Sequence, residues 1–475
     1  MSRYFVFVTV SLALILSAMS STAVAVAFPV ITSSFDTSLI LAGWVLSIYQ
    51  LVLTAAMPVA GKASDVFGRK NVFLFCLGLF SVGSLLCAIA PNIQLLILFR
   101  VIQAIGGGGF MPSAAGIVSD EFPKARQQAI GLFTSIFPIG QIIGPNLGGW
   151  LTTVFGWRYI FWFNMPLAAV ILVGSTLLLH SEQRKESSID LTGAGLFTGS
   201  IFAFMMALSQ LGDIQTDISW ALVGPLFVLS IILMFAFLRH EAKVPNPIID
   251  PVVLQHRPFL AANIYNFVLG ACYFGISSLA PLYAVSVYNM SVLASGLILT
   301  LKAIGMMFTS TVTSILLVRW GYRRPMLIGT AGIILTLVFL GLESPDISIL
   351  GITVGGTVLV LAILGLAGAA MGMTAPAANN ACIELMPQRV ATITGIRGMF
   401  RQTGGAISIS VATLTLQNIG DMARGFQIVF FGLAIIMLIF MPVIFLMPHR
   451  AEKIADPGED VQQAVLTARM EKKIE

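Results

Sequence analysis

The sequence predicts an all-α polytopic membrane protein, and three observations support this class. Of its 475 residues, 57% are hydrophobic and only 10% are charged. The mean hydropathy is +0.93. A soluble domain carries about 25% charged residues, so this composition excludes a fully aqueous protein. Finally, apolar segments of about 20 residues recur along the chain, which is the length a helix needs to cross the hydrocarbon layer.

We expect fourteen transmembrane helices from these apolar segments. The first six are predicted near residues 5–31, 42–60, 71–90, 93–118, 127–153 and 158–180. Two more are predicted near 190–211 and 220–239. The last six are predicted near 258–286, 293–317, 325–343, 349–375, 391–417 and 424–447. The first segment is too long for the core of a signal peptide, so we interpret it as an uncleaved first helix.

The basic residues orient these helices, because Lys and Arg accumulate in cytoplasmic loops. Alternate loops contain Lys62, Arg69, Lys70, Lys124, Arg126, Arg184, Lys185, Arg239, Lys243, Arg257, Arg319, Arg323, Arg324 and Arg389. The intervening loops contain only Arg158 and Arg424. We therefore expect the N-terminus and the C-terminus to be cytoplasmic. The net charge of +5 follows from this topology and does not indicate a nucleic-acid partner.

Two pairs of loops indicate an internal repeat. The loop after the second span, at 66–70, has a glycine followed by two basic residues, and so does the loop after the tenth, at 319–324. The loops after the fourth and twelfth spans, at 121–126 and 384–389, both combine a glutamate, a proline and an arginine. In both pairs the second loop follows the first by eight helices. This spacing predicts two six-helix bundles, spans 1–6 and 9–14, with spans 7–8 inserted between them.

The repeat divides the chain into four predicted parts. These are an N-terminal six-helix bundle (1–182), an inserted transmembrane helix pair with its flanking loops (183–245), a C-terminal six-helix bundle (246–448) and a cytoplasmic tail (449–475). Parallel halves of this kind place a substrate site at their interface, near the middle of the bilayer.

The loop after the second span combines glycines with charges. Gly61 and Gly68 allow tight turns and close helix approach. Asp65 and Arg69 are four residues apart, near helix ends, with Lys70 beside them. A carboxylate in this position can pair with cations or face the N-terminus of a neighbouring helix.

The fifth span has glycines at four-residue spacing. Gly140, Gly144, Gly148 and Gly149 are small enough to let two backbones pack closely. Pro145 adds a kink because it removes one helical hydrogen bond. We therefore expect tight packing of this span against a facing helix.

Six motifs in a fixed order resemble the major facilitator superfamily, in its fourteen-span drug:proton antiporter branch. Residues 61–70 are similar to the signature loop between its second and third helices. Arg100-x-x-Gln103, with Gly106, resembles the motif of its fourth helix. Residues 140–149 resemble the fifth-helix motif that marks exporters. The remaining three resemblances, to the aromatic entry into helix 6 and to patterns of helices 7 and 13, lie at 156–166, 190–193 and 401–405.

The resemblance implies functions for two of these motifs. Contacts of Asp65 would form a cytoplasmic latch that holds the halves together in the outward-facing state. The glycines of 140–149 would form a hinge that limits leakage while the halves rock. One position departs from the branch. The branch usually carries an aspartate in helix 1 shortly before a proline, and in this sequence Ser20 occupies that position. This departure puts proton coupling by the usual residue in doubt.

Four cations lie within predicted spans. Arg100 is roughly 10 Å below the outer end of its helix, whereas Lys302 and Arg401 are roughly 15 Å in, near the middle of the bilayer. Arg397 is one turn from Arg401 on the same face. Each would cost about 2.5–3.5 kcal/mol on a lipid face, so we expect them to point inward. For Arg100 and Arg401, a scaffold role that binds carbonyl groups is as consistent with the sequence as contact with substrate.

No carboxylate occurs at a matching depth. The cavity is therefore predicted to be electropositive, which favours an anionic or strongly electronegative substrate. We expect Lys302 to bind the substrate or to take part in coupling. Further polar candidates for the cavity, which ordinary interhelical hydrogen bonding would explain equally well, are Gln103, Gln141, Asn146, Asn263, Asn266 and Tyr273, together with Tyr49 and Gln50.

The remaining patterns exclude other classes. The cysteines and histidines show no metal-binding spacing, and no nucleophile–base pair or Walker-type loop is present. We expect no cofactor, no metal and no enzymatic activity. The predicted function is secondary active export of amphipathic small molecules, coupled to the proton gradient, by a monomer in the cell membrane. The alternative is an anion, metabolite or lipid transporter of the same fold with different coupling.

Overall fold

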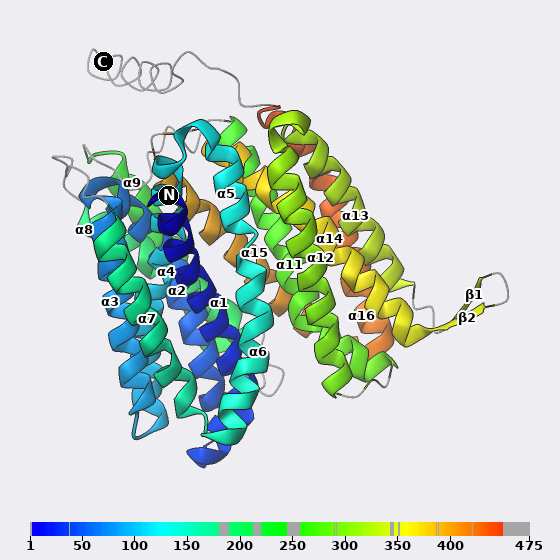
Figure 1. The fold of residues 1–475 in the computed structure, drawn as a ribbon. Coiled ribbons are helices and arrows are strands. Elements are labelled where there is room, and N and C mark those ends of the chain that lie inside the picture. The colour runs from blue at the N-terminus through cyan, green and yellow to red at the C-terminus, as the bar shows by residue number, and fades with distance from the viewer. Residues whose placement is uncertain are drawn as a thin grey trace.

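The computed structural model describes residues 2–37, 39–179, 190–211, 220–244, 257–288, 290, 292–342, 346–349, 352–385, 387, 389–419 and 421–449. The predicted helical class is confirmed over this part of the chain (Figure 1). The N-terminal half contains α1 (Ser2–Ser34), α2 (Leu39–Phe67), α3 (Arg69–Ala88), α4 (Ile93–Glu121), the short 3₁₀ helix η1 (Pro123–Ala125), α5 (Arg126–Thr134), α6 (Phe137–Val154) and α7 (Arg158–Leu178).

The predicted insertion and the C-terminal half follow. The inserted pair is α8 (Leu191–Leu211) and α9 (Trp220–Glu241). The C-terminal half contains α11 (Arg257–Tyr288), α12 (Val292–Trp320), α13 (Arg323–Gly341), α14 (Gly356–Ile383), α15 (Val390–Ile419), α16 (Met422–Phe440) and the 3₁₀ helix η2 (Met441–Leu446). Apart from His449, the predicted tail at 449–475 lies outside the described residues, as do the predicted boundaries at 182–183 and 245–246.

Twelve candidate membrane spans meet the length and hydropathy that a crossing requires, within the described ranges. The segment Pro123–Val154, which contains α5 and α6, counts as one of them. Helices α8 and α15 are not among the twelve. The apolar segment of α8, Thr192–Leu208, is shorter than a crossing requires, and the arginines Arg397 and Arg401 lower the mean hydropathy of α15.

Two details differ from the sequence-based prediction. The fifth span is not one helix, because α5 ends at Thr134 and α6 starts at Phe137. Pro138, at the second position of α6, has no N–H to continue the hydrogen-bond ladder across this junction. The span predicted at 349–375 starts later, at Gly356.

An antiparallel strand pair accounts for that later start and adds a small β element to the predicted all-helical fold. Strand β1 (Asp346–Ile349) pairs with β2 (Ile352–Gly355), and Asp346 lies opposite Gly355. The sequences DISI and ITVG are rich in β-branched residues, which favour strands. The hairpin projects from the body of the molecule (Figure 1).

Figure 1 shows the helices of the two halves side by side at the end of the molecule where α1 begins and diverging toward the opposite end. We call these the proximal and distal ends. Helix α2 packs against α15, and α5 packs against α12, so both contacts join the two halves. The core within each half is built by α3 against α4 and by α11 against α15, among other pairs.

The inserted helices form a pair that contacts both halves. The Ser200 hydroxyl donates to the Ser230 carbonyl at 2.9 Å, and the Ser230 hydroxyl donates to the Ser200 carbonyl at 3.0 Å. This exchange joins α8 to α9. Helix α8 packs against α2 and α15, and the Ser410 hydroxyl of α15 donates to the Leu208 carbonyl at 2.8 Å.

The glycines of α6 pack against α1, within the same half. A Cβ added to Gly140 would lie 2.7 Å from the Cβ of Ala18. One added to Gly144 would overlap the Thr22 hydroxyl, and one added to Gly148 would lie 2.7 Å from the Cα of Ala23. At Gly149 the nearest atom, on Val26, is 3.7 Å away, which is ordinary contact. The first three glycines therefore set the distance between these two backbones.

We expect Gly148→Ala to lower the thermal stability of the purified protein, because the added methyl group would meet backbone atoms of α1 that have little freedom to move. Overpacking of this kind costs about 1–3 kcal/mol. The matched control is Gly78→Ala in α3, where nothing lies within 4 Å of the new Cβ. Since alanine favours a helix over glycine by about 1 kcal/mol, the control should keep or raise the melting temperature. Equal melting temperatures for the two variants would contradict the close α1–α6 contact.

Candidate functional site

Arg100 binds the scaffold of the N-terminal half. It is buried in α4, where its Nε donates to the Val45 carbonyl at 3.1 Å and its Nη1 donates to Oε1 of Gln103 at 2.7 Å. The guanidinium carbon lies 4.0 Å from the centre of the Tyr49 ring. All these partners come from α2 and α4, so this cation is stabilised without substrate.

A buried polar cluster extends from Gln103. Its Nε2 donates to the Ser84 hydroxyl at 2.7 Å and to the Ser20 hydroxyl at 3.5 Å. Nδ2 of Asn164 donates to the same two hydroxyls, at 3.4 and 3.3 Å. Ser20, which replaces the expected helix-1 carboxylate, is thus an acceptor for two amides. Ser84 and Asn164 were not predicted as site residues, because single small polar residues in an apolar helix form no recognisable pattern.

A second cluster, which we call the cation cluster, lies where α11, α12 and α15 meet. It consists of Tyr273, Lys302, Arg397 and Arg401. The Lys302 Nζ lies 4.4 Å from the centre of the Tyr273 ring, and Cζ of Arg401 lies 4.6 Å from the same centre. Lys302, only 4% exposed, also donates to the Tyr273 carbonyl at 3.4 Å and to the Ser277 hydroxyl. One aromatic ring therefore contacts two cations.

The cation cluster reaches the other half of the molecule through one hydrogen bond. The Tyr273 hydroxyl donates to Oε1 of Gln141 at 2.6 Å. Gln141 belongs to α6, in the N-terminal half, and Tyr273 belongs to α11, in the C-terminal half. The structure thus brings together four of the residues that the sequence proposed separately: Gln141, Tyr273, Lys302 and Arg401.

The arginines of the cation cluster keep hydrogen-bond donors without a partner. Arg397 is 2% exposed, yet its Nε and Nη2 make no hydrogen bond. The Nε of Arg401 is also unpartnered. Among the described residues, no carboxylate lies within ion-pair distance of Lys302, Arg397 or Arg401. The cluster therefore carries uncompensated positive charge in an apolar surrounding.

Three other candidates make hydrogen bonds only within their own helices. Asn263 and Asn266 are buried in α11 and donate to the carbonyls of Phe259 and Ala262, at 2.9 and 2.8 Å. Asn146 is exposed on α6 and donates to the Ile142 carbonyl at 2.8 Å. The structure therefore does not link them to the cation cluster by hydrogen bonds.

Asp65 connects the two halves at the proximal end. Its Oδ2 accepts hydrogen bonds from the backbone N–H of Thr392 at 2.9 Å and from the Thr392 hydroxyl at 2.8 Å. Thr392 lies in the first turn of α15, where N–H groups lack helical partners and negative charge is favoured. Gly61 permits this approach, because a Cβ there would lie 2.5 Å from the Ala391 carbonyl oxygen.

The rest of this loop binds the N-terminal half. Nη1 of Arg69 donates to the Gly116 carbonyl at 2.8 Å, and the guanidinium also pairs with Asp65 and Asp120. Lys70 donates to the Leu179 carbonyl at 2.5 Å, near the end of α7. Gly68 has a φ of 90°, a conformation that side chains with a Cβ disfavour. These contacts hold the loop in place while Asp65 reaches across the interface.

A second set of contacts closes the proximal end between α5 and the C-terminal half. Nη2 of Arg126 lies 3.7 Å from Oε1 of Glu384, and Nε2 of Gln127 donates to the same oxygen at 3.3 Å. Deeper in the interface, the hydroxyls of Ser135 and Ser310 are 2.6 Å apart. The pairing of Arg126 with Glu384 was not predicted from the sequence, because it depends on how the halves dock.

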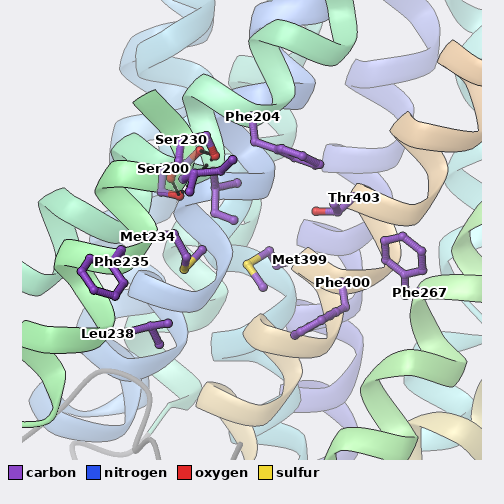
Figure 2. Close-up of a pocket in the computed structure, with 12 residues that line it drawn as sticks. Ser200, Phe204, Ser230, Met234, Phe235, Leu238, Phe267, Met399, Phe400 and Thr403 are labelled. Atoms are coloured by element: carbon purple, nitrogen blue, oxygen red, sulfur yellow. Dashed lines mark hydrogen bonds between the residues drawn. The ribbon is translucent and has the colours of Figure 1, made fainter. Parts of the chain in front are cut away.

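An apolar groove of about 510 Å³ lies between the inserted pair and the C-terminal half (Figure 2). It is lined by Ser200, Ile201, Phe204, Ser230, Ile231, Met234, Phe235, Leu238, Phe267, Met399, Phe400 and Thr403. Figure 2 shows the hydroxyl of Thr403 pointing into the groove, and this hydroxyl has no hydrogen-bond partner. This groove was not predicted from the sequence, since segments from two different parts of the chain form it.

Comparison with known proteins identifies the family. The family model described as Major Facilitator Superfamily matches residues 10–409. Multidrug resistance protein 3 of Bacillus subtilis (strain 168) is 33% identical over 358 residues, which cover 74% of this chain and 69% of that protein. The tetracenomycin C resistance and export protein of Streptomyces glaucescens is 28% identical over 424 residues, covering 87% of this chain and 76% of that protein.

A solved structure has the same fold. The crystal structure of the human organic anion transporter MFSD10 (TETRAN) aligns with a TM-score of 0.63, at 17% identity, over 93% of this chain and 99% of that chain. At this identity the likeness shows the fold alone. The family model covers most of the sequence, so the resemblance to this superfamily is confirmed. The chain belongs to the Major Facilitator Superfamily, and it is a membrane transporter and not an enzyme.

Proposed function

We propose that this protein exports amphipathic small molecules by secondary active transport, in which two six-helix halves rock about a central site. The observation that carries the proposal is the set of polar contacts between the halves at the proximal end, above all Asp65 with Thr392. These contacts can break without disrupting the fold of either half. The names of the relatives, a multidrug resistance protein and a resistance and export protein, support export as the direction.

The proximal end is the cytoplasmic end in this proposal. Arg69, Lys70, Arg126 and Arg323 all lie there, and basic residues favour the cytoplasmic side. The structure then represents a state closed toward the cytoplasm, and both termini are cytoplasmic. Helices α8 and α15 complete a set of fourteen spans in a monomer. The glycines of α6 keep α1 and α6 together while the halves move.

The proton gradient is the proposed energy source. The sequence contains no loop of the type that cradles nucleotide phosphates, so an ion gradient remains as the drive. Ser20 also favours a second candidate, an anion, metabolite or lipid transporter with different coupling. Its hydroxyl sits in a hydrogen-bonded amide cluster and supplies no carboxylate to carry a proton.

Proteoliposomes with an imposed pH gradient test the energy source. We expect a fluorescent amphiphile to move against its concentration gradient when the gradient is present, and to stop when a protonophore collapses it. The readout is fluorescence in the vesicle lumen, compared with protein-free liposomes. Movement of the amphiphile that does not depend on the pH gradient would exclude proton antiport and favour the second candidate.

Asp65→Ala should open the proximal end, because it removes two hydrogen bonds to the first turn of α15. One hydrogen bond to a charged group contributes about 1.5–3 kcal/mol, so the loss of even one of the two should lower the closed-to-open ratio by about 10- to 150-fold. The measurement is the labelling rate of Ser310→Cys by a maleimide, in a chain without its four native cysteines. Ser310 is buried at the interface, so its labelling reports opening.

Asp421→Ala is the matched control for that experiment. Asp421 also caps a helix, accepting from the N–H groups of Ala423 and Arg424 at 3.0 and 3.4 Å, but it does so within the C-terminal half. Its removal should leave the labelling rate of Ser310→Cys unchanged. If both variants label at the same rate, Asp65 does not act as a latch between the halves.

A further inference from the structure

We propose that the exported molecule carries an acidic group, a carboxylate, sulfonate or phosphate, and that Arg397 and Arg401 bind it. The inference rests on the proposed function and names the class of its substrate. We further infer that binding of this group draws Arg401 away from Tyr273 and so loosens the hydrogen bond that joins the two halves at the cation cluster.

Charge balance gives the first argument. Lys302, Arg397 and Arg401 lie on helices of the C-terminal half, and no described carboxylate is within ion-pair distance of any of them. By contrast, Asp65, Asp120 and Glu384 pair with arginines at or near helix ends. A buried charge is stable only with a counter-charge or a full set of hydrogen bonds. The described part of the chain holds no such counter-charge, and the transported molecule is best suited to supply it.

The unpartnered donors locate the binding position. Arg397 and Arg401 are four residues apart on α15, which places them on one face of the helix. Nε and Nη2 of Arg397 and Nε of Arg401 make no hydrogen bond. A guanidinium presents its N–H groups as a fork that matches the oxygens of a carboxylate or phosphate. Two such forks one turn apart form a site for one acidic group.

Lys302 has a different place in the cluster. Its ammonium group is bonded to the Ser277 hydroxyl and the Tyr273 carbonyl, and it contacts the Tyr273 ring. It therefore adds positive potential but has fewer free donors than the arginines. Arg100 differs further, because its Nε and Nη1 are bonded within the N-terminal half. The two arginines of α15 are thus the pair best suited to the acidic group.

Tyr273 links this site to the movement of the halves. Its ring contacts Arg401, and its hydroxyl donates to Gln141 of the other half at 2.6 Å. An anion attracts a guanidinium more strongly than an aromatic ring does, since full charges interact more strongly than a charge and a quadrupole. When Arg401 turns to the anion, the ring loses one of its two cations and can turn away from Gln141. The acidic group would thereby release a contact between the halves.

Binding of two matched probes tests the substrate class. Pyrenebutyrate and pyrenebutanamide share one apolar body and differ in charge, and their fluorescence reports binding to the purified protein. We expect the wild-type chain to bind pyrenebutyrate at least about tenfold more tightly, as a charge-assisted contact implies. Arg401→Gln and Arg397→Gln should each remove most of that preference and leave the affinity for pyrenebutanamide within about twofold.

Two further variants keep this test independent of folding. Arg401→Lys retains the positive charge without the fork, so it should retain part of the preference. Arg158→Gln removes a cation that binds the Ala90 carbonyl outside the cation cluster, and it should keep the full preference. Equal binding of the two probes by the wild-type chain, no saturable binding of pyrenebutyrate, or an equal loss for both probes in Arg401→Gln would overturn the proposal.

Tyr273→Phe tests the link to movement, because it keeps the ring and removes the bond to Gln141. Pyrenebutyrate should raise the labelling rate of Ser310→Cys in the otherwise wild-type chain. In the Tyr273→Phe chain the rate should already be raised, and the ligand should add little. A response of wild-type size in Tyr273→Phe would show that Tyr273 does not transmit binding.

The outcomes also separate this inference from the proposed function. If pyrenebutyrate binds selectively but no probe moves in response to a pH gradient, the substrate class stands and proton-driven export fails. If both probes are exported equally well, export stands and the acidic-group site fails.

Discussion

The arrangement of this protein depends on one constraint: a charged group inside an apolar helical bundle needs a partner. At the proximal end the constraint is met by pairing, because Asp65 caps α15 and Arg126 lies beside Glu384. In the middle of the C-terminal half it is met only in part, by the Tyr273 ring and a few hydroxyl and carbonyl groups. The paired charges hold the two halves together, whereas a ligand of opposite charge would stabilise the incompletely paired cations.

The two halves stabilise their buried cations differently. In the N-terminal half, Arg100 is surrounded by Val45, Gln103 and Tyr49, and the neighbouring amides reach Ser20. That cluster is neutral apart from one stabilised cation. In the C-terminal half, Arg397 and Arg401 retain free donors. The similar loops that predict an internal repeat therefore do not imply similar chemistry in the two halves, and the positive potential is concentrated on one side of the interface.

Much of the fold could be predicted from the sequence, because apolar length and loop charge are properties of single segments. The junction between α5 and α6 and the β1–β2 hairpin were not predicted, since both depend on local backbone preferences inside an apolar stretch. For the candidate site, residue type and depth singled out Lys302, Arg401, Tyr273 and Gln141 separately. Their meeting at one ring depends on how α6, α11, α12 and α15 dock. The same reason explains why the Thr392 partner of Asp65 was not predicted.

The close packing of α6 on α1 has a mechanical consequence. At Gly140, Gly144 and Gly148 the two backbones are in close contact, so we expect α1 to move together with Gln141. The Gln141 side chain, which accepts a hydrogen bond from the Tyr273 hydroxyl, therefore lies on a helix that is closely packed against α1. A turn of the Tyr273 ring would therefore act on α1 and α6 together, and not on the Gln141 side chain alone.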